Sequence, residues 1–502
     1  MMRKNYMAKA SSLYGILVAV LCSVFVACSE KGDHNGNSIY NPELPVSVTR
    51  FAPLEGTYGQ EIVIYGSNFG TDTTKISVTI GGRKARLIYA KGDSIRCTVP
   101  YKAESGHYGV QVIMGDKATG TQSAAANARF TYVSSLVVRT LIGYRISDNN
   151  PGWKDGTFGT GKDDGSATFG LQAAFMKFDP KYPDHLYVAY EDFDNSGYGI
   201  QLINLKEKTV KTVLPGSCFE SRRLRGIDFT LKGDMLVATD RDDKQLKTPS
   251  VWIVKRNADG SFTTGSVREV LAAYKQCNTV AVHPVNGEMY FNSYYRSNMF
   301  RMEINKYYQA AATGETWKPN WADKNYEKLF TLPEDRLNFN ITIHPSGKYA
   351  YVILLNKNCI YRMDYDQENK TFKKPYLFAG QQGIKGWADG KGDDVQMNYP
   401  YQGVFVKNKE YAEQGKEDVY DFYFCDYDNY CVRYLTPEGH VKTYAGRGAM
   451  SAMKDNNTWG PEDGDLKETA RLGSPTGIAY DEKTATFYVF DRWYHSIRTI
   501  GK

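Results

Sequence analysis

The sequence predicts an all-β protein with two successive domains and very little helix. Short runs of alternating apolar and polar residues recur along the chain, and turn residues separate them. After residue 134 a longer pattern of paired strands repeats. Aromatic residues make up 14% of the chain, with 38 Tyr against 23 Phe, and such residues favour strands. A chain of 502 residues also has room for two or three domains.

The chain begins with an export pattern. Three basic residues, Arg3, Lys4 and Lys9, precede an uncharged apolar run over 13–27, and Cys28 follows that run directly. A basic start and a short apolar core are typical of a secretion signal, and the run is shorter than the roughly 20 residues of a membrane-spanning helix. A cysteine after a small residue resembles the lipobox of bacterial lipoproteins. The resemblance implies cleavage before Cys28 and lipid attachment to it, while an ordinary signal peptide with an incidental cysteine is the alternative.

Charge and hydropathy limit the classes of partner. The formal net charge is +6, and it falls to +3 without the predicted signal peptide, residues 1–27. Charges of both signs are interspersed, so the chain has no basic stripe for nucleic acid. No later apolar run is long enough to span a bilayer, so membrane contact is expected through the lipid anchor alone. Residues 28–43 are polar and rich in Gly and Asn, which predicts a flexible tether.

Residues 44–133 are expected to form a small β-sandwich. Turn residues separate alternating runs at 61–65, 76–80, 109–113 and 128–132. A more specific pattern is carried by 51–56 (FAPLEG), 64–70 (IYGSNFG), 78–82 (VTIGG) and 97–100 (CTVP). These segments resemble an IPT/TIG domain, an immunoglobulin-like module that spaces or docks other domains. Its glycines allow a tight turn at positive φ, and Phe69 is expected to fill the core.

Residues 134–502 repeat a unit of three or more strands. First strands are expected at 175–180, 225–230, 278–284, 339–345, 401–406 and 475–481. Their spacing is uneven, about 50 to 75 residues, which leaves room for loop insertions. Two segments carry the most specific pattern, 441–446 (VKTYAG) at the end of one unit and 475–479 (PTGIA) at the start of the last. They resemble NHL-type β-propeller blades, and six first strands imply six blades.

The last unit ends at Lys502 after three strands, so its outer strand is expected to come from elsewhere. The segment 137–143 (VVRTLIG) is similar to the closing strand at 441–446. Adding this segment to the last blade would join the ends of the propeller and remove exposed sheet edges. The predicted fold is therefore an IPT/TIG β-sandwich over 44–133, followed by a six-bladed NHL-like β-propeller over 134–502.

The residues favour a non-catalytic protein over an enzyme. The seven histidines show no metal-ligand spacing, and His283 and His344 end first strands where other repeats have Asp, which predicts turn capping. Nucleophile-elbow, Walker and Rossmann patterns are absent where they could function. No cofactor is expected, although calcium in the propeller channel stays open. The Asp-rich segments 192–195 and 240–243 lack the EF-hand spacing and are interpreted as solvated loops.

Cysteine usage leaves two interpretations open. Six cysteines remain after Cys28, too few for a disulfide scaffold in a chain of this length. Cys425 and Cys431 flank a short polar loop. A disulfide across this loop is one alternative, and two buried free thiols are the other.

The propeller loops supply the candidate binding residues. Loops between second and third strands gather at one face, and here they mix acidic, arginine, amide and aromatic side chains. Aromatic rings can stack on the apolar faces of sugars, and planar polar groups can pair with sugar hydroxyls. Solvation of the rim is the alternative. The candidate ligand-binding residues are Trp153, Arg241, Tyr294, Arg296, Trp387, Asp426, Tyr427, Arg492 and Trp493.

Some of these candidates belong to a second, shorter repeat. It has Trp close before Asp-Gly, at 152–156 (GWKDG), 386–390 (GWADG) and 459–464 (WGPEDG), ahead of three first strands. Asp-Gly is a turn signal, so this pair is interpreted as ordering the loop. The tryptophans are less easily explained in this way, because loops seldom need three.

The order of anchor, tether, IPT/TIG spacer and NHL-like propeller resembles lipoproteins that accompany glycan-uptake systems in Gram-negative bacteria. The resemblance implies a lipid-anchored protein of the outer membrane, at the cell surface, that binds oligo- or polysaccharide without catalysis. An outer-membrane transporter is its candidate partner. Because propellers host many functions, two alternatives stay open. One is a hydrolase or lyase with a metal-assisted site at the channel mouth, and the other is a protein–protein interaction scaffold.

Overall fold

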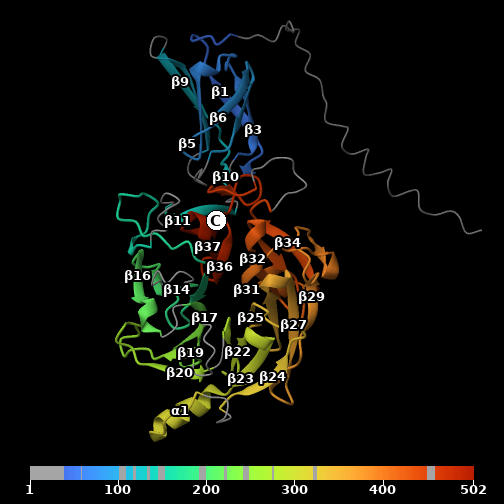
Figure 1. The fold of residues 1–502 in the computed structure, drawn as a ribbon. Helices are drawn as coiled ribbons and strands as arrows, with labels where there is room; N and C mark the ends of the chain where they lie inside the picture. Colours follow the sequence, from blue (N-terminus) through green and yellow to red (C-terminus); the bar gives the residue numbers. More distant parts are fainter. Residues whose placement is uncertain are drawn as a thin grey trace, which may run out of the picture. The chain divides into compact units, whose positions relative to one another are not determined.

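The computed structural model describes most of the chain from residue 39 onward. The described residues are 39–57, 59–100, 109–116, 120–132, 136–144, 153–191, 199–219, 223–240, 248–273, 276–319, 325–448 and 458–502. They belong to two compact units, Met1–Ser134 and Ser135–Lys502 (Figure 1). Within these ranges no helix is both long and apolar enough to cross a membrane. The predicted lipid-attachment residue, Cys28, lies outside the described residues.

The first unit is a β-sandwich, as predicted. One sheet contains, in order, β1 (Ser47–Ala52), β3 (Glu61–Ser67), β7 (Ser94–Thr98) and β6 (Arg86–Lys91). The other contains β5 (Arg83–Lys84), β4 (Ile76–Ile80), β8 (Val110–Asp116) and β9 (Gly120–Ala125). A short parallel pair joins β10 (Thr131–Tyr132) to β2 (Glu55–Gly56). The sequence pattern therefore located both sheets of this unit.

The core of the sandwich explains its glycine-rich segment. Phe69 is fully buried among the apolar residues of both sheets, as expected. A Cβ atom on Gly66 would lie 1.9 Å from the backbone oxygen of Ser47, so no larger residue fits there. Gly70 adopts φ of +62°, a conformation that glycine adopts without a steric penalty. This segment thus needs its glycines for close packing and for a turn.

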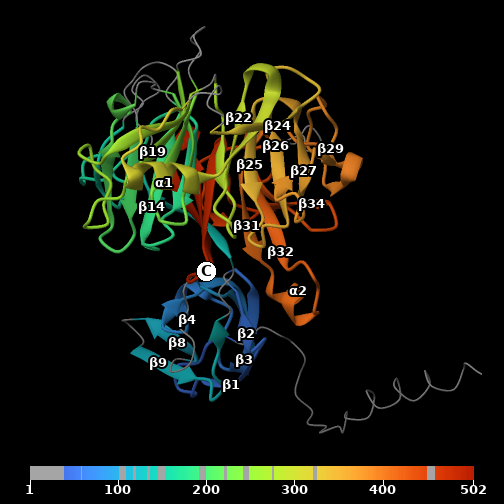
Figure 2. The same ribbon diagram turned by 90° about the horizontal axis from the view of Figure 1, so that it is seen from below.

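The second unit consists of antiparallel sheets that are packed face to face around a centre (Figures 1 and 2). Six such sheets are formed by the described residues of this unit. The first sheet contains β13 (Ala174–Phe178), β14 (His185–Tyr190), β15 (Ile200–Asn204), β16 (Thr209–Leu214) and β12 (Gly156–Thr157). The second contains β17 (Leu224–Phe229), β18 (Met235–Thr239), β19 (Pro249–Val254) and β20 (Arg268–Ala273).

The next two sheets follow the same order. The third contains β21 (Val280–Val282), β22 (Met289–Ser293), β23 (Asn298–Met302) and β24 (Glu327–Thr331). The fourth contains β25 (Phe339–Ile343), β26 (Tyr349–Leu354), β27 (Cys359–Asp366), β28 (Thr371–Phe372) and β29 (Tyr376–Gly380). Two helices interrupt the pattern, α1 (Ile304–Thr313) after β23 and α2 (Lys409–Glu413) after β31.

The last two sheets complete the unit. The fifth contains β31 (Pro400–Lys407), β32 (Tyr420–Asp426), β33 (Cys431–Leu435), β34 (His440–Ala445) and β30 (Gly390–Lys391). The sixth contains β36 (Pro475–Asp481), β37 (Thr486–Asp491), β38 (Ser496–Gly501), β11 (Val137–Ile142) and β35 (Gly464–Asp465). In every sheet the first strand of the predicted repeat lies at the inner end. These inner strands are β13, β17, β21, β25, β31 and β36.

The inner strands contact one another in a closed ring. The order is β13, β17, β21, β25, β31 and β36, and β36 contacts β13 again. Strand β11 pairs antiparallel with β38, so that Val138 faces Ile500 and Val137 faces Gly501. This pairing confirms the prediction that 137–143 supplies the outer strand of the last sheet. A closed ring of twisted sheets is a β-propeller, and its closure leaves the ring without an open end.

Turns between the first and second strands are capped by side chains, as predicted for the two histidines. The Nδ1 atom of His283 accepts hydrogen bonds from the backbone N–H groups of Val285 and Asn286, both at 3.3 Å. His344 accepts from the N–H of Ser346 at 3.1 Å. In the first sheet Asp179 occupies the same place and accepts from the N–H of Lys181 at 2.8 Å. The two histidines are therefore structural.

Candidate functional site

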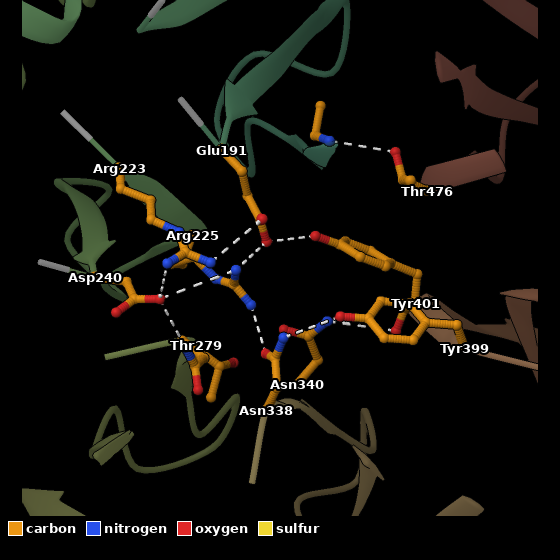
Figure 3. Close-up of polar contacts among 12 residues, drawn as sticks. Glu191, Arg223, Arg225, Asp240, Thr279, Asn338, Asn340, Tyr399, Tyr401 and Thr476 are labelled. Carbon is orange, nitrogen blue, oxygen red and sulfur yellow. Dashed lines mark hydrogen bonds and ion pairs between the residues drawn. The ribbon is translucent and has the colours of Figure 1, made fainter. Parts of the chain in front are cut away.

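The channel through the propeller has two chemically different ends. Phe178, Phe229 and Ile343 lie at the ends of their inner strands and line a mainly apolar cavity of about 410 Å³, whose wall also contains the ion pair of Lys177 and Asp228. At the opposite end, where the inner strands begin and the second strands finish, the side chains are polar. This end, which we name the polar mouth, contains Glu191, Arg223, Arg225, Asp240, Asn338, Tyr399 and Tyr401 (Figure 3).

A buried ion pair forms the centre of the polar mouth. Arg225 is 1% exposed and Glu191 is 2% exposed, and the Nη1 atom of Arg225 contacts Oε1 of Glu191. The Tyr401 hydroxyl donates a hydrogen bond to the same carboxylate. Arg225 in turn donates from Nη2 to the side-chain oxygen of Asn338. Buried charges need such partners, because an unpaired charge away from water is very costly.

A second ion pair lies closer to solvent. Arg223 is 32% exposed, and its Nη1 atom lies 3.3 Å from Oδ2 of the buried Asp240. Its Nη2 atom lies 4.0 Å from Oε2 of Glu191, so one arginine bridges both acids. Asn278 donates to Asp240 at 3.2 Å. The mouth therefore contains two arginines and two acids, and its formal charge is balanced.

Hydrogen bonds also tie the inner strands together around the mouth. Thr476 accepts from the backbone N–H of Ala174 at 3.2 Å, and Thr279 accepts from that of Ile341 at 3.1 Å. Asn340 donates to the backbone oxygen of Tyr401 at 3.4 Å. Figure 3 shows these residues around the central ion pairs. Side-chain hydrogen bonds near the start of the inner strands thus join neighbouring sheets around the mouth.

A hollow of about 290 Å³ opens beside the exposed ion pair. Every residue that lines it has a side chain able to form hydrogen bonds: Arg223, Asp240, Gln276, Asn278, Tyr294, Asn338, Asn356 and Tyr399. Burial raises the pKa of Tyr399, and it raises that of Tyr401 well above its ordinary value, with the charge of Glu191 adding to the effect. Both phenols are therefore neutral donors at physiological pH. The hollow suits a ligand that is rich in hydroxyl groups.

The described residues show no assembled metal site. Within the described ranges, no group of three or more His, Cys, Asp or Glu side chains is placed to hold a metal ion. The cysteines seen in the structure are free, including Cys425 and Cys431, so the thiol alternative holds for that pair. Burial raises the pKa of Cys277, the cysteine bonded to Asn292 beneath the mouth, to about 12. Such a thiol is a packing residue and not a nucleophile at neutral pH.

Comparisons with known proteins follow the same division of the chain. Residues 45–132 match the IPT/TIG domain family. No curated protein matches the chain. A structure from Bacteroides thetaiotaomicron, described provisionally as a phosphatase, is 40% identical, with 93% of this chain and 99% of that one covered and a TM-score of 0.81.

Two further structures are described as auxiliary nutrient binding proteins. The one from Bacteroides thetaiotaomicron is 35% identical with a TM-score of 0.78, and the one from Bacteroides ovatus is 34% identical with a TM-score of 0.63. Each comparison covers 92% of this chain and 99% of the other. The chain belongs to the same family as these Bacteroides proteins. Both of its units are thus part of the family's architecture.

Two of the predicted binding residues, Tyr294 and Tyr427, adjoin the polar mouth of this family member, and a third, Arg492, contacts Tyr427. Tyr294 lines the hollow. Arg492 donates through Nη1 to the hydroxyl of Tyr427, and the Tyr427 ring lies 5.8 Å from that of Tyr399 and 6.2 Å from that of Tyr401, centroid to centroid. Their role in binding stays a prediction. The structure shows that Arg492 and Tyr427 come together from neighbouring sheets.

Other predicted residues have structural contacts instead. The indole nitrogen of Trp153 donates to Thr212 at 3.0 Å, and that of Trp387 donates to Thr443 at 3.1 Å, so both rings are tied to outer strands. Asp426 is fully buried and pairs with the buried Arg433 at 2.9 Å. These three residues therefore lie in the packing of their sheets and do not line the hollow.

Two further predicted residues, Arg296 and Trp493, do not line the hollow. Arg296 has φ of +65°, stacks on Tyr295 at 5.6 Å and does not line the hollow. Trp493 is 42% exposed in the loop between β37 and β38. Arg241 lies outside the described residues.

Sequence reasoning missed the residues at the centre of the mouth. Asp240 was expected in a solvated loop, but it is 5% exposed, so that interpretation is wrong for this residue. A usable signal was present in Arg225 and Tyr401, because each stands at the start of a first strand whose residues are otherwise mostly apolar or small. A charged residue at a buried strand position needs a buried partner, and the strand pattern does not show which.

Proposed function

We propose that the protein is a cell-surface lipoprotein that binds an oligo- or polysaccharide for uptake without altering it chemically. The observation that carries the proposal is the hollow at the polar mouth, in which every lining side chain can form hydrogen bonds. Fixed amides, phenols and a balanced ion pair suit neutral hydroxyl groups better than a charged ligand. The two relatives described as nutrient binding proteins support a binding role.

The test is direct binding by the full mature chain. Affinity gels that contain soluble starch, dextran, arabinoxylan, xyloglucan or yeast mannan would identify a retained polysaccharide. Isothermal titration would then compare Tyr294→Ala and Arg223→Ala with the wild type. We expect each variant to bind about tenfold more weakly, because one hydrogen bond or ionic contact contributes about 1.5 kcal/mol.

The neighbouring residue provides a matched control. Tyr295 is 40% exposed and does not line the hollow, so Tyr295→Ala is expected to bind like the wild type. Equal losses in Tyr294→Ala and Tyr295→Ala would argue against the mouth as the site. Retention of none of the polysaccharides by the wild type would contradict the proposed function.

The anchor is part of the same proposal and has its own test. Cells grown with labelled palmitate should incorporate label into the wild type but not into Cys28→Ala. Protease treatment of intact cells should then remove the wild-type protein if it faces the outside. Labelling of Cys28→Ala at the wild-type level would contradict attachment at Cys28.

A hydrolase is the second candidate, because one relative at 40% identity is described as a phosphatase. Release of nitrophenol from p-nitrophenyl phosphate, measured with and without added Mg²⁺, Mn²⁺ or Zn²⁺, would test it. Turnover that is lost in Arg223→Ala but kept in Tyr295→Ala would favour the hydrolase over the binding protein.

A further inference from the structure

Two tryptophans lie exposed beside the polar mouth. Trp459 is 41% exposed and Trp493 is 42% exposed, and their ring centroids are 6.2 Å apart with the planes at 82°. Trp459 also packs against Tyr430 and Tyr494, both at 6.3 Å. We name Tyr430, Trp459, Trp493 and Tyr494 the aromatic platform. Large aromatic rings contribute most to folding when they are buried, so an exposed pair is a surface feature that the core does not explain.

The repeat that contains Trp459 shows that the fold does not require this indole. In the other two copies the tryptophan precedes the aspartate by two residues, as in Trp387 and Asp389, and its indole bonds to the outer strand. In the third copy Trp459 precedes Asp463 by four residues. Asp463 still caps the outer strand, since it accepts from the N–H and hydroxyl of Thr140 at 2.9 and 3.0 Å. Trp459 is thus displaced from the structural position that its counterparts occupy.

Charged groups border the platform. Asp428 lies two residues before Tyr430, and Arg492 lies directly before Trp493. Burial raises the pKa of Asp428, while the charges of Lys385 and Arg492 act in the opposite direction. An acid and an arginine next to exposed indoles are the groups that pair with sugar hydroxyls while a ring stacks.

The platform is also connected to the polar mouth. Arg492 donates to the Tyr427 hydroxyl, and Tyr427 packs against Tyr399 and Tyr401 in the mouth. Tyr427 and Trp493 occupy equivalent loops of neighbouring sheets, between the second and third strands. Arg492 thus links the loop that carries Trp493 to the aromatic residues of the polar mouth.

We propose that Trp459 and Trp493 form a stacking subsite for a second pyranose unit of the saccharide chain whose first unit enters the polar mouth. Because the two indole rings are nearly perpendicular, one ring can stack on the face of a sugar while the other contacts the edge of the same sugar. The proposal rests on the proposed function and deepens it. It makes the ligand an oligosaccharide or the end of a polysaccharide, and it assigns the mouth and the platform different units.

The test uses the full mature chain and the polysaccharide that the affinity gels identify. Titrations would compare its monosaccharide with its hexasaccharide, for example glucose with maltohexaose if soluble starch is retained. We expect Trp459→Ala and Trp493→Ala each to weaken hexasaccharide binding at least tenfold and to leave monosaccharide binding within twofold of the wild type. Arg223→Ala should weaken both. Hexasaccharide should also shift the tryptophan emission of the wild type more than that of the double variant.

A matched control variant is Tyr376→Ala, since Tyr376 is 47% exposed on the outer strand β29. It should bind both sugars like the wild type, and Trp459→Ala, Trp493→Ala and Tyr376→Ala should each melt within a few degrees of the wild type because these three side chains are exposed. Unchanged hexasaccharide affinity in both tryptophan variants would overturn the subsite while leaving the proposed function intact. Equal losses for both sugars would also overturn it. A wild type that binds no saccharide would overturn the function and the subsite together.

Discussion

Arg225 and Glu191 fix the side chains that a ligand would meet in the polar mouth. Both are buried, and their charges are completed by Asn338 and by the hydroxyl of Tyr401. Burial acts to lower the pKa of Arg225, but the neighbouring Glu191 raises it overall, so the guanidinium stays charged although it is buried. A buried pair contributes little net stability, yet it is costly to break. The main effect of this ion pair is therefore to hold the side chains of Asn338 and Tyr401 in place.

If the ion pair acts in this way, removing one partner should destabilise the protein more than replacing both partners. Arg225→Met leaves the buried Glu191 without its nearer cation, with only Arg223 at 4.0 Å, so we expect a loss of about 3–5 kcal/mol in the free energy of unfolding. The double variant Glu191→Gln and Arg225→Met should recover a large part of that loss. Urea unfolding followed by tryptophan fluorescence is the measurement, and a double variant as unstable as the single one would contradict this account.

At the scale of the element, each hairpin between a first and a second strand carries a cap. Asp179 performs this task in the first sheet and His283 in the third, through the same bonds to backbone N–H groups two residues on. The histidine adds a bond from Nε2 to the backbone oxygen of Gly347 at 3.0 Å. Because this bond reaches the fourth repeat, His283 links two sheets as well as closing a turn.

The cap makes stability depend on pH. Burial lowers the pKa of His283 below its usual value near 6.5. The unfolded chain therefore binds a proton that the folded chain does not, and stability should fall as the pH drops below about 6.5, with a limiting slope of about 1.4 kcal/mol per pH unit. The nearby Glu288 opposes the shift. At pH above 7 the group has no such effect.

The variant His283→Asn keeps a cap without a titrating group. We expect it to be less stable than the wild type at pH 7.5, because it loses the contact with Gly347, but to lose less stability between pH 7.5 and 5.5. Melting temperatures across this range measure the difference. Parallel pH profiles for the two proteins would show that another group is responsible.

At the scale of the whole molecule, the propeller is closed by strands from its two ends. Strand β11 lies between β38 and β35, so that Val138 pairs with Ile500 on one side and Gly464 on the other. The side chain of Val138 is fully buried. Closure brings residues more than 350 positions apart into one sheet, since Val138 and Ile500 face each other. Such a contact is costly in loop entropy and is needed to complete the ring.

Val138→Pro should open the ring. Proline removes the N–H of this position and with it a hydrogen bond of the ladder, so it is rarely tolerated in a strand that is paired on both sides. All seven tryptophans lie after residue 134, so their fluorescence reports on the second unit alone. We expect Val138→Pro to lower the melting temperature in this signal more than the control Val138→Ala, which loses only methyl groups. Equal shifts would mean that packing, and not strand pairing, maintains the closure.

The sequence itself determined the fold class, the strand order within the repeats and the closing strand of this protein. Alternation of apolar residues has a period that identifies strands, and a repeat such as 441–446 recurs at 137–143 whatever its surroundings. The turn caps were also predictable, because His283 and Asp179 bond to residues next to them in the chain. The strand pattern and the turn caps depend on residues that are close together in the chain, so they can be identified from the sequence alone.

Only the tertiary structure decided which polar residues form the mouth and which tryptophans are exposed. Arg225 and Glu191 come from different sheets, and Tyr401 is 210 residues from Glu191, so no spacing could reveal their contact. Trp153, Trp387 and Trp459 belong to the same short sequence repeat, but the first two bond to outer strands and Trp459 is 41% exposed. The physical reason is that burial of a polar or aromatic group depends on partners that the closed ring brings together, and the chain alone does not specify them.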